Sequence, residues 1–392
     1  MLALLAPGQG SQTPGMLTPW LDLPGTQARV RWLSEVTGLD LLRLGTTAGA
    51  DEILDTSVTQ PLIIALGLVA AAELEPPDLT VTAGHSVGEL TAAAVAGVFS
   101  PETAVALARL RGREMAAACS LAPTGMSAVL GGDPDEVVAR IEACGLVPAN
   151  RNGAGQVVAA GSVDGLAELA DKPPTGARVK ALPVAGAFHT PYLAPAEQAL
   201  AAVAGGITAA DPQRLLLSNA DGTAVSAGRE IVARLVRQLT RPVRWDLCQA
   251  TLRDLGVTAV VELPPAGTLA GLAKRELPGV AVVALKKPAD LAAAQTLLAR
   301  AGHGGQGEHT PDWRVVVAPV GGTFHPVALD ESMQVPARSP LGMVRTRREE
   351  HQVSAAYHGV LVEWLLEDGD LVGPGEPVAR LYPLAPGRAG VA

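Results

Sequence analysis

The chain has 392 residues, enough for two or three domains, and 48% of them are hydrophobic, which is ample for a buried core. A net charge of −9 excludes general binding to nucleic acids or anionic membranes. Only three cysteines occur, and they are widely spaced, which excludes a disulfide framework and a metal knuckle. No signal peptide heads the chain and no apolar run approaches the roughly 20 residues of a membrane span, so a cytoplasmic protein is expected.

The N-terminal segment reads as a strand that runs into a turn. Residues 2–6 are apolar and stop at the Gly-rich sequence PGQGSQ of residues 7–12. Such a turn often cradles a phosphate, but the lysine of a P-loop is absent. Gln9 has a side-chain amide that could donate into an oxyanion hole, or it is simply a loop residue in water. Residues 26–75 read as helices, one of them beginning at Gln60-Pro61 with the proline in its first turn.

Residues 79–98 have the pattern of a nucleophile elbow. Residues 79–81 are apolar and partly β-branched, as in a strand, and the sequence GHSVGE follows at 84–89. From residue 89 to residue 98 the chain is rich in alanine and leucine, which favours a helix. A strand, a Gly-x-Ser-x-Gly turn and a helix together form this elbow.

The chemistry of an elbow needs each residue of the turn. Gly84 and Gly88 have no Cβ, so strand and helix can pack closely while the turn exposes the Ser86 hydroxyl. The N–H of Val87 has no acceptor within the helix and would point at an incoming carbonyl oxygen. The alternative is a Gly-rich turn in which Ser86 merely caps the helix. The flanking strand and helix favour a catalytic Ser86.

A second helix is predicted at 101–119, and it carries three arginines. Arg109 and Arg113 are four residues apart, on one face, and are most simply solvated. Arg111 points to the other side, where a buried guanidinium needs an anion. The spacing leaves open whether that anion is a structural carboxylate or a substrate.

Residues 124–187 have the β-α-β-β-α-β order of a ferredoxin-like subdomain, inserted into a larger α/β unit. The pattern predicts a turn at Asn152-Gly153 between the two middle strands. Strands are expected at 126–130, 146–150, 156–160 and 178–184, and helices at 134–144 and 163–170.

His189 follows this insert and is the candidate base for Ser86. Acyl transfer needs such a pair, because the imidazole takes the hydroxyl proton and returns it to the leaving thiol. The spacing does not show that the two residues meet, and six other histidines compete, of which His85 reads as structural. No aspartate is evident to orient the imidazole, and a backbone carbonyl could do so equally well.

The rest of the α/β unit extends to residue 301, and a Gly-rich linker is expected at 302–312. Further strands are expected at 214–218, 258–263 and 280–285, and further helices at 228–240, 245–255 and 288–301.

Five motifs in order resemble the malonyl-CoA:acyl-carrier-protein transacylase family. They are PGQGSQ at 7–12, GHSVGE at 84–89, LRG at 110–112, GAFH at 186–189 and PVRW at 242–245. The sequence ELPPAGTLAGL at 262–272 is similar to the actinobacterial form. The resemblance covers about residues 1–300 and implies an α/β-hydrolase-like core with a ferredoxin-like subdomain.

The resemblance also implies an activity, in which malonyl passes from CoA to a serine and then to the phosphopantetheine thiol of an acyl carrier protein. This ping-pong chemistry, in fatty-acid or polyketide synthesis, needs no metal, redox or covalently bound cofactor. The implied roles are nucleophile for Ser86, base for His189, oxyanion donors for Gln9 and the Val87 N–H, malonyl-carboxylate binder for Arg111, and a barrier to α-methyl groups for Phe188.

Residues 313–392 resemble a biotin carboxyl carrier domain, a small all-β fold of the biotinyl or lipoyl type. Residues 315–326 match its opening and residues 358–378 its closing half. The biotin-accepting lysine of the carrier aligns best with Arg348, and no lysine occurs after Lys287. Because an arginine cannot form the biotin amide, carrier chemistry is excluded.

Two other functions remain open. One is a hydrolase, such as an editing thioesterase, that uses the same Ser86-His189 pair, although Arg111 would then lack a carboxylate to bind. The other is an interaction protein in which the tail dominates. For the tail itself, one candidate partner is the carboxylase that makes malonyl-CoA, and the alternative is a purely stabilising role.

Overall fold

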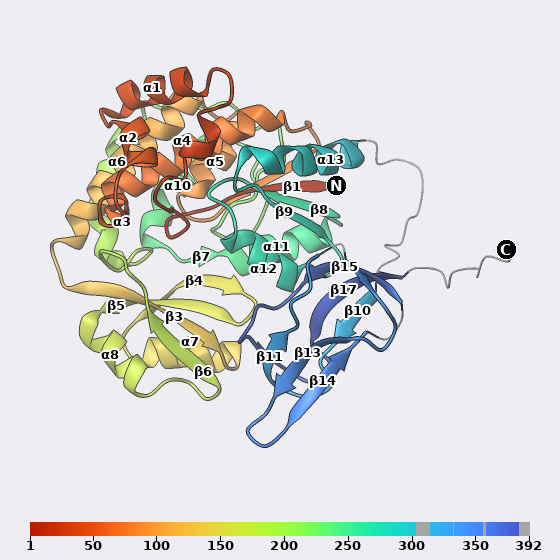
Figure 1. Ribbon diagram of the computed structural model, residues 1–392. Coiled ribbons are helices and arrows are strands. Elements are labelled where there is room, and N and C mark those ends of the chain that lie inside the picture. The colour runs from red at the N-terminus through yellow and green to blue at the C-terminus, as the bar shows by residue number, and fades with distance from the viewer. Residues whose placement is uncertain (303–313, 332, 356–357, 384–392) are drawn as a thin grey trace. The chain divides into compact units, whose positions relative to one another are not determined.

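The computed structural model describes residues 1–302, 314–331, 333–355 and 358–383. The chain falls into two compact units, residues 1–304 and 305–392, each of which is described by itself (Figure 1). Apart from Gly302, the expected linker lies outside the described residues, as do His303 and His309.

A four-stranded parallel sheet, in the order β2-β1-β8-β9, lies at the centre of the first unit. These strands span Val81–Gly84, Leu2–Ala6, Ala259–Glu262 and Ala281–Ala284, respectively. Every residue of β1 is buried, as expected for a parallel sheet that helices cover (Figure 1). Because β1 and β2 are parallel neighbours, the turn at 7–12 and the elbow leave the sheet at the same edge, where ligands bind in such folds.

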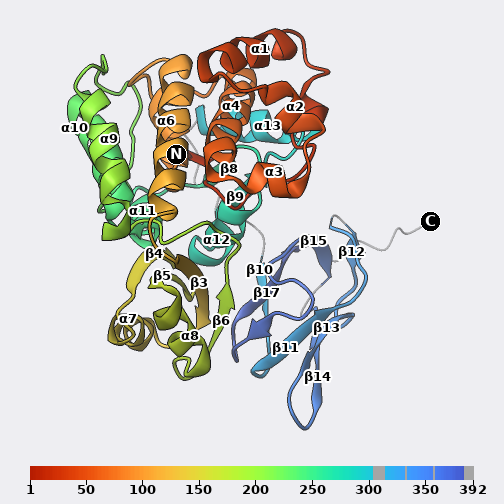
Figure 2. The same ribbon diagram turned by 90° about the vertical axis from the view of Figure 1, so that its left-hand side faces the viewer.

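Two long helices, α4 (Thr56–Leu74) and α6 (Pro101–Cys119), pack side by side (Figure 2). The elbow helix α5 (Gly88–Val95) contacts both of them and ends three residues before its expected end. The other helices are α1 (Thr26–Thr37), α2 (Leu41–Thr46), α3 (Ala50–Leu54), α9 (Ala194–Ala204), α10 (Gly228–Arg237), α11 (Trp245–Asp254), α12 (Thr268–Glu276) and α13 (Leu291–Gly302).

Four short 3-10 helices complete the unit, namely η1 (Thr18–Trp20), η2 (Pro191–Leu193), η3 (Gln238–Thr240) and η4 (Pro288–Asp290). The helix expected at 228–240 is therefore divided into α10 and η3. The strand expected at 214–218 forms only isolated bridges, Thr82 to Leu216 and Leu217 to Ala224. The expectation of a regular strand there was wrong, because only single residues pair.

The start of α4 corrects two expectations. The helix begins at Thr56, where the Asp55 side chain accepts from the Ser57 N–H, so Pro61 lies inside it and not in its first turn. Pro61 has no N–H to donate to the carbonyl of Ser57, four residues earlier. The guanidinium of Arg109 donates to that carbonyl instead, at 3.0 Å. Arg109 therefore completes a helix and is not simply solvated.

By length and composition alone, α4 could cross a membrane, contrary to the expectation that no apolar run approaches this length. Its apolar window is 78% buried inside the protein, and residues 62–66, 68–71 and 74 belong to the main core. We therefore regard α4 as a core helix.

A second sheet, in the order β6-β3-β5-β4-β7, belongs to the segment inserted between α6 and η2. The chain passes through β3 (Thr124–Gly131), α7 (Pro134–Ala143), β4 (Val147–Gly153), β5 (Gln156–Ser162), α8 (Val163–Asp171) and β6 (Ala177–Ala181), and β7 (Val243–Arg244) is added beside β4. The β-α-β-β-α-β order is as predicted. The turn between β4 and β5 lies at Ala154-Gly155, two residues later than expected, because Asn152 is a buried strand residue.

The second unit consists of two antiparallel sheets, β10-β17-β15-β12 and β14-β13-β11-β16. Their strands are β10 (Arg314–Val317), β11 (Gly322–Pro326), β12 (Gln334–Val335), β13 (Pro340–Arg345), β14 (Glu350–Ser354), β15 (Gly359–Trp364), β16 (Leu371–Val372) and β17 (Pro377–Pro383). One apolar cluster around Phe324 and Leu361 forms the core of this all-β unit.

Candidate active site

Ser86 lies in a sharp turn between β2 and α5. A Cβ on Gly84 would stand 2.1 Å from the backbone of Gly88, and a Cβ on Gly88 would stand 2.2 Å from the Ala6 carbonyl oxygen. Both glycines are therefore required by close packing, as the sequence predicted. Ser86 itself has a φ of 52°, a left-handed conformation that costs a residue with a side chain about 1–3 kcal/mol.

Asn219 holds this strained turn from both sides. Its Oδ1 accepts from the Ser86 N–H at 2.7 Å, and its Nδ2 donates to the Gly84 carbonyl at 2.6 Å. Asn219 is fully buried, so neither bond competes with water. This residue could not be predicted from the sequence, because a single asparagine in a loop has no distinctive spacing.

His189 meets Ser86, which the spacing could not show. Its Nε2 lies 2.7 Å from the Ser86 Oγ, and its Nδ1 lies 2.8 Å from the backbone carbonyl of Gln238. Because a carbonyl only accepts, Nδ1 carries the proton and Nε2 is free to accept from the serine hydroxyl. A backbone carbonyl thus orients the imidazole, as the sequence analysis allowed.

His189 is held neutral. It is 2% exposed, and burial lowers its pKa to about 3, with the positive charge of Arg111 acting in the same direction. A neutral imidazole is the form that can take a proton from Ser86 at neutral pH.

This perturbation predicts a dependence of stability on pH. Between its folded pKa near 3 and its ordinary value of 6.5, His189 binds a proton only when the chain is unfolded, so its contribution is complete above pH 6.5 and lost as the pH falls. Relative to a His189→Gln variant, the natural protein should lose about 2 kcal/mol of unfolding free energy between about pH 7.5 and pH 5. Thermal melts of both proteins measure this, and a constant difference between them would show that His189 titrates normally.

Arg111 enters the site from α6, is 2% exposed and has neutral groups as its hydrogen-bond partners. Its Nη1 donates to Gln60 Oε1 at 2.8 Å, and its Nη2 donates to Gln238 Oε1 at 3.0 Å and to Ser86 Oγ at 3.3 Å. No carboxylate in the described ranges forms an ion pair with it. Burial lowers its pKa to about 10, so it stays protonated. A buried cation beside the nucleophile suits an anionic substrate group.

Gln9 and Val87, the oxyanion donors suggested by the sequence, lie in the turns that follow the neighbouring strands β1 and β2. Gly8 packs so closely that a Cβ there would stand 2.5 Å from the His85 carbonyl oxygen, which brings the 7–12 turn against the elbow. The Gln9 side chain donates to Thr56 Oγ1 at 3.1 Å. Over the described residues, neither the backbone N–H of Gln9 nor that of Val87 donates a hydrogen bond.

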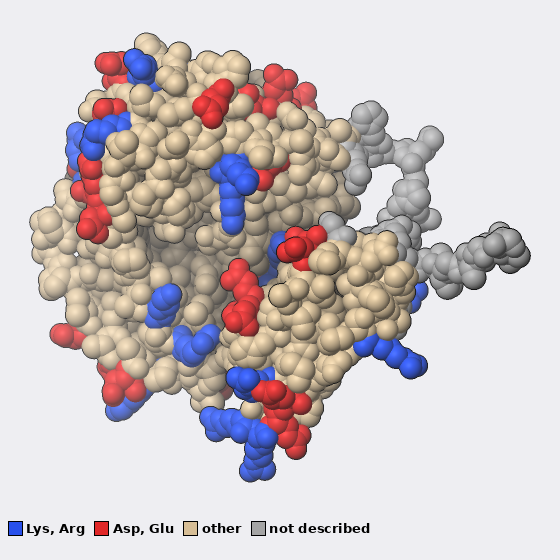
Figure 3. All heavy atoms as spheres, viewed as in Figure 1, with Lys and Arg blue, Asp and Glu red and all other residues tan. Residues whose placement is uncertain are grey.

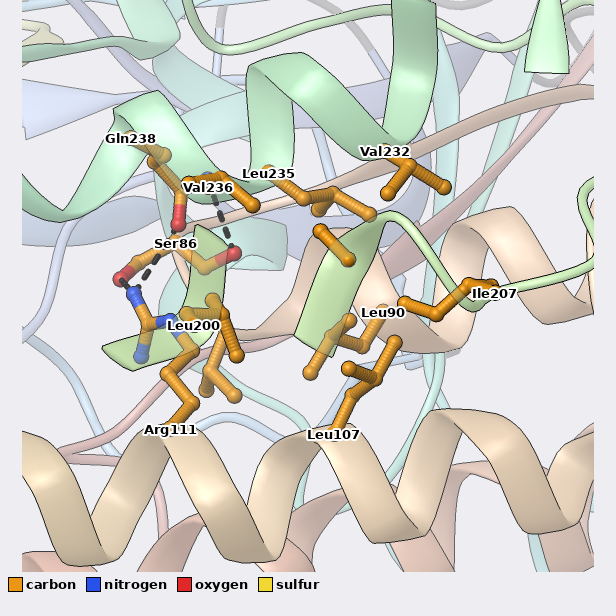
Figure 4. Close-up of a pocket in the computed structure, with 12 residues that line it drawn as sticks. Ser86, Leu90, Leu107, Arg111, Leu200, Ile207, Val232, Leu235, Val236 and Gln238 are labelled. Carbon is orange, nitrogen blue, oxygen red and sulfur yellow. Dashed lines mark hydrogen bonds between the residues drawn. The ribbon is translucent and has the colours of Figure 1, made fainter. Parts of the chain in front are cut away.

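An apolar pocket adjoins Ser86 and Arg111 (Figure 4). Figure 4 shows Arg111, Gln238 and Ser86 converging at one end, while the apolar side chains continue between α6 and α10. The remaining lining residues are Val87, Leu90, Leu107, Leu200, Ala204, Ile207, Val232, Leu235 and Val236. Such walls exclude water from the reacting groups and strengthen their electrostatic interactions.

The other candidate residues have structural positions. Phe188 is buried in the main core, next to His189 in the chain. His85 bonds Asn152 Oδ1 through its Nε2 at 2.9 Å and packs edge-on against Trp245, which fits the structural role expected for it.

The surface charge is mixed. Figure 3 shows Lys and Arg side chains among Asp and Glu side chains over the face that the figure presents, without an extended area of one sign.

The chain matches known proteins over this first unit. The acyl transferase domain family matches residues 4–296. A malonyl CoA-acyl carrier protein transacylase of Mycobacterium tuberculosis is 58% identical over 296 residues, which are 74% of this chain and 98% of that protein.

Solved structures give the same result. The crystal structure of MCAT from Mycobacterium tuberculosis superimposes with a TM-score of 0.73 at 57% identity, over 75% of this chain and 99% of that one. A malonyl-transacylase solved in complex with its type II PKS acyl-carrier protein has a TM-score of 0.72 at 30% identity, over 76% of this chain and 99% of that one. All of these matches leave about a quarter of this chain uncovered.

Proposed function

Since the chain belongs to the malonyl-CoA:acyl-carrier-protein transacylases of the acyl transferase family, we propose that Ser86 is its nucleophile and His189 its general base. The chain transfers malonyl from malonyl-CoA to an acyl carrier protein, in fatty-acid or polyketide synthesis. The geometry described above supports the role that we propose for each residue.

In the first half-reaction, His189 Nε2 takes the hydroxyl proton as Ser86 Oγ attacks the thioester carbonyl. The Val87 N–H and Gln9 stabilise the resulting oxyanion, and we assign the Gln9 contribution to its backbone N–H, because its side chain is bonded to Thr56. Collapse breaks the carbon–sulfur bond, and the proton on His189 passes to the departing CoA thiol.

The second half-reaction is the reverse with a different thiol. His189 removes the proton from the phosphopantetheine thiol of the carrier, the sulfur attacks the malonyl ester, and the proton returns to Ser86 Oγ. Because the same Nε2···Oγ contact of 2.7 Å serves both halves, no additional acid or base is needed.

The observation that carries the choice of malonyl is the environment of Arg111. It is a buried cation, 3.3 Å from the nucleophile, and all its partners are neutral oxygens. A malonyl ester on Ser86 would bring a carboxylate within reach, and a guanidinium can bind it through two parallel hydrogen bonds. We also propose that Phe188 contributes to selectivity. It directly precedes His189 in the chain, and its buried ring would crowd an α-methyl substituent.

The same serine and histidine could support hydrolysis, but an uncharged acyl group would offer no carboxylate to the Arg111 guanidinium. The experiment that separates the two is incubation with malonyl-CoA and a phosphopantetheinylated carrier, with malonyl-carrier and free malonate measured together. We expect malonyl-carrier to form at the rate at which CoA is released. Free malonate as the main product would identify a hydrolase.

For the architecture we propose an α/β-hydrolase-like core in residues 1–301 with a ferredoxin-like subdomain at 124–187. The support is the parallel sheet that ends in the elbow and the strand order β6-β3-β5-β4 of the insert. We also propose a cytoplasmic location, which suits the substrates malonyl-CoA and a carrier protein.

We further propose that residues 313–392 are a biotinyl-carrier-like domain without an acceptor lysine. Two opposed antiparallel sheets form it, and Arg348 lies in the exposed turn between β13 and β14, closed by the hydrogen bond from the Thr346 N–H to the Glu349 carbonyl. An arginine at this turn cannot be biotinylated. The domain then serves as a docking module, for which the carboxylase that makes malonyl-CoA is one candidate partner, or it stabilises the enzyme.

Removal of the tail separates these roles. A fragment of residues 1–301 should keep full transfer activity, because relatives of about this length are complete proteins. Loss of carboxylase capture with an unchanged melting temperature would support docking, whereas a large drop in melting temperature with no lost partner would support stabilisation. Loss of the acyl-enzyme in a folded fragment would contradict the assignment of the whole site to residues 1–301.

A further inference from the structure

Glu89 has no part in the proposed chemistry, yet it is the acidic side chain most closely tied to the site. It lies in the first turn of α5, three residues after Ser86, and is 5% exposed. A carboxylate is rarely buried to this degree unless hydrogen bonds satisfy both its oxygens.

Both oxygens of Glu89 are satisfied by residues that touch the catalytic groups. Oε1 accepts from the Asn219 backbone N–H at 2.5 Å, and Oε2 accepts from Gln238 Nε2 at 2.5 Å. Both donors carry protons on nitrogen and cannot accept one, so the contacts fit a carboxylate. Burial raises the pKa of Glu89 to about 8, while the Asn219 N–H, the guanidinium groups of Arg111 and Arg234, and Gln238 oppose this rise.

The contact with Gln238 fixes the orientation of an amide. Since Nε2 of Gln238 donates to Glu89 and, at 3.1 Å, to the Ser86 carbonyl, its Oε1 must face the other way. There Oε1 accepts from Arg111 Nη2 at 3.0 Å. A rotated amide would direct its NH₂ group at the guanidinium, where two donors repel each other.

We propose that Glu89 is a positioning residue for malonyl selectivity, which it exerts by setting the Gln238 amide so that Arg111 is aligned beside Ser86. This inference rests on the proposed role of Arg111. Glu89 acts at the same time on Asn219, whose side chain holds the Ser86 turn, so one carboxylate connects the elbow with the malonyl-binding cation.

The conservative variant Glu89→Gln tests this. Its amide oxygen can still accept from the fixed Asn219 N–H, but its NH₂ group would then face Gln238 Nε2 and drive that amide to rotate. Because the hydrogen bond that fixes the Gln238 amide is lost, kcat/KM for malonyl-CoA should fall roughly 10- to 100-fold. The rate of Ser86 acylation by acetyl-CoA, which has no carboxylate for Arg111, should fall much less.

A matched control is available in Glu262, a second buried carboxylate of the same unit. It is fully buried and accepts from the backbone N–H groups of Gly267, Leu269 and Ala270, none of which belongs to the proposed catalytic or malonyl-binding groups. Glu262→Gln should lower the melting temperature without changing the ratio of malonyl to acetyl acylation rates. Equal losses for both acyl groups in Glu89→Gln, or no loss for either, would overturn the proposal.

A second variant keeps the test decisive if Glu89→Gln does not fold. Gln238→Met removes the intermediary amide and leaves the backbone carbonyl that orients His189. It should reproduce the selective malonyl loss, and where both single variants fold, the double variant should lose no more than either alone. Unchanged selectivity in Gln238→Met would refute the route through this amide. The natural protein, assayed in parallel, reports separately on the proposed function, which fails if malonyl-CoA leaves no ester on Ser86.

Discussion

Replacement of Ser86 by alanine should abolish malonyl transfer, with a loss of roughly 10⁴-fold or more. The reason is that the Ser86 hydroxyl, 2.7 Å from His189 Nε2, is the group that we propose forms the covalent intermediate. The measurement is the initial rate of malonyl-carrier formation at saturating malonyl-CoA.

Ser127→Ala is a suitable control for this variant, because Ser127 is also buried but lies in β3 of the inserted segment. It should retain the activity of the natural protein. Substantial transfer by a folded Ser86→Ala protein would mean that malonyl passes directly between thiols or through another residue, and the elbow would then have only a structural role.

Replacement of Arg111 by alanine should have the second-largest effect. It should lower the rate of transfer of malonyl groups and not that of acetyl groups. Loss of the two hydrogen bonds that we propose Arg111 donates to the malonyl carboxylate should reduce kcat/KM for malonyl-CoA by roughly 100-fold or more, because charge-assisted bonds in a buried site are strong. The rate with acetyl-CoA should be nearly retained. Acylation rates with both CoA thioesters, measured on the same protein preparation, give the ratio directly.

The Arg111→Lys variant is the control for charge alone. An ammonium keeps the positive charge but cannot replace the planar guanidinium, which donates to Gln60, Gln238 and Ser86. Partial recovery of malonyl transfer is therefore expected. Equal losses for malonyl and acetyl groups in Arg111→Ala would assign this residue to the structure of the site.

The sequence was sufficient for the parts of the site that depend on local geometry. The spacing of Gly84, Ser86 and Gly88 predicted the elbow, and the close approach of both glycines explains why, since a side chain at either would overlap backbone atoms. The orientation of Arg111 away from its neighbours Arg109 and Arg113 also followed from helical geometry. Helical geometry could not decide whether Arg111 pairs with a structural carboxylate or with a substrate anion. The structure favours a substrate anion, because the hydrogen-bond partners of Arg111 are neutral oxygens.

The remaining groups could not be predicted, because they act through contacts between residues far apart in the chain. Gln238 lies 49 residues beyond His189 and orients it through a backbone carbonyl, which any residue type could supply. Asn219 and Gln60 likewise hold catalytic groups across more than 50 residues. One signal was available for Gln238, which lies four residues before the PVRW motif at 242–245.

The errors in the predicted elements have a common cause. Pro61 suggested the start of a helix, yet α4 begins five residues earlier, and Arg109 satisfies the carbonyl that the proline leaves free. Asn152 suggested a turn, yet it is a strand residue that binds His85. In both cases a tertiary contact replaced the local hydrogen bond on which the prediction depended.

The central claim is that Ser86 carries malonyl between two thiols, and the acyl-enzyme itself tests it most directly. The natural protein is incubated with malonyl-CoA alone, digested and analysed by peptide mass spectrometry, and a second sample is first chased with phosphopantetheinylated carrier. We predict one malonyl group on the peptide containing Ser86, and its complete transfer to the carrier in the chase. A malonyl group on another residue, or its release as free malonate in the presence of the carrier, would contradict the claim.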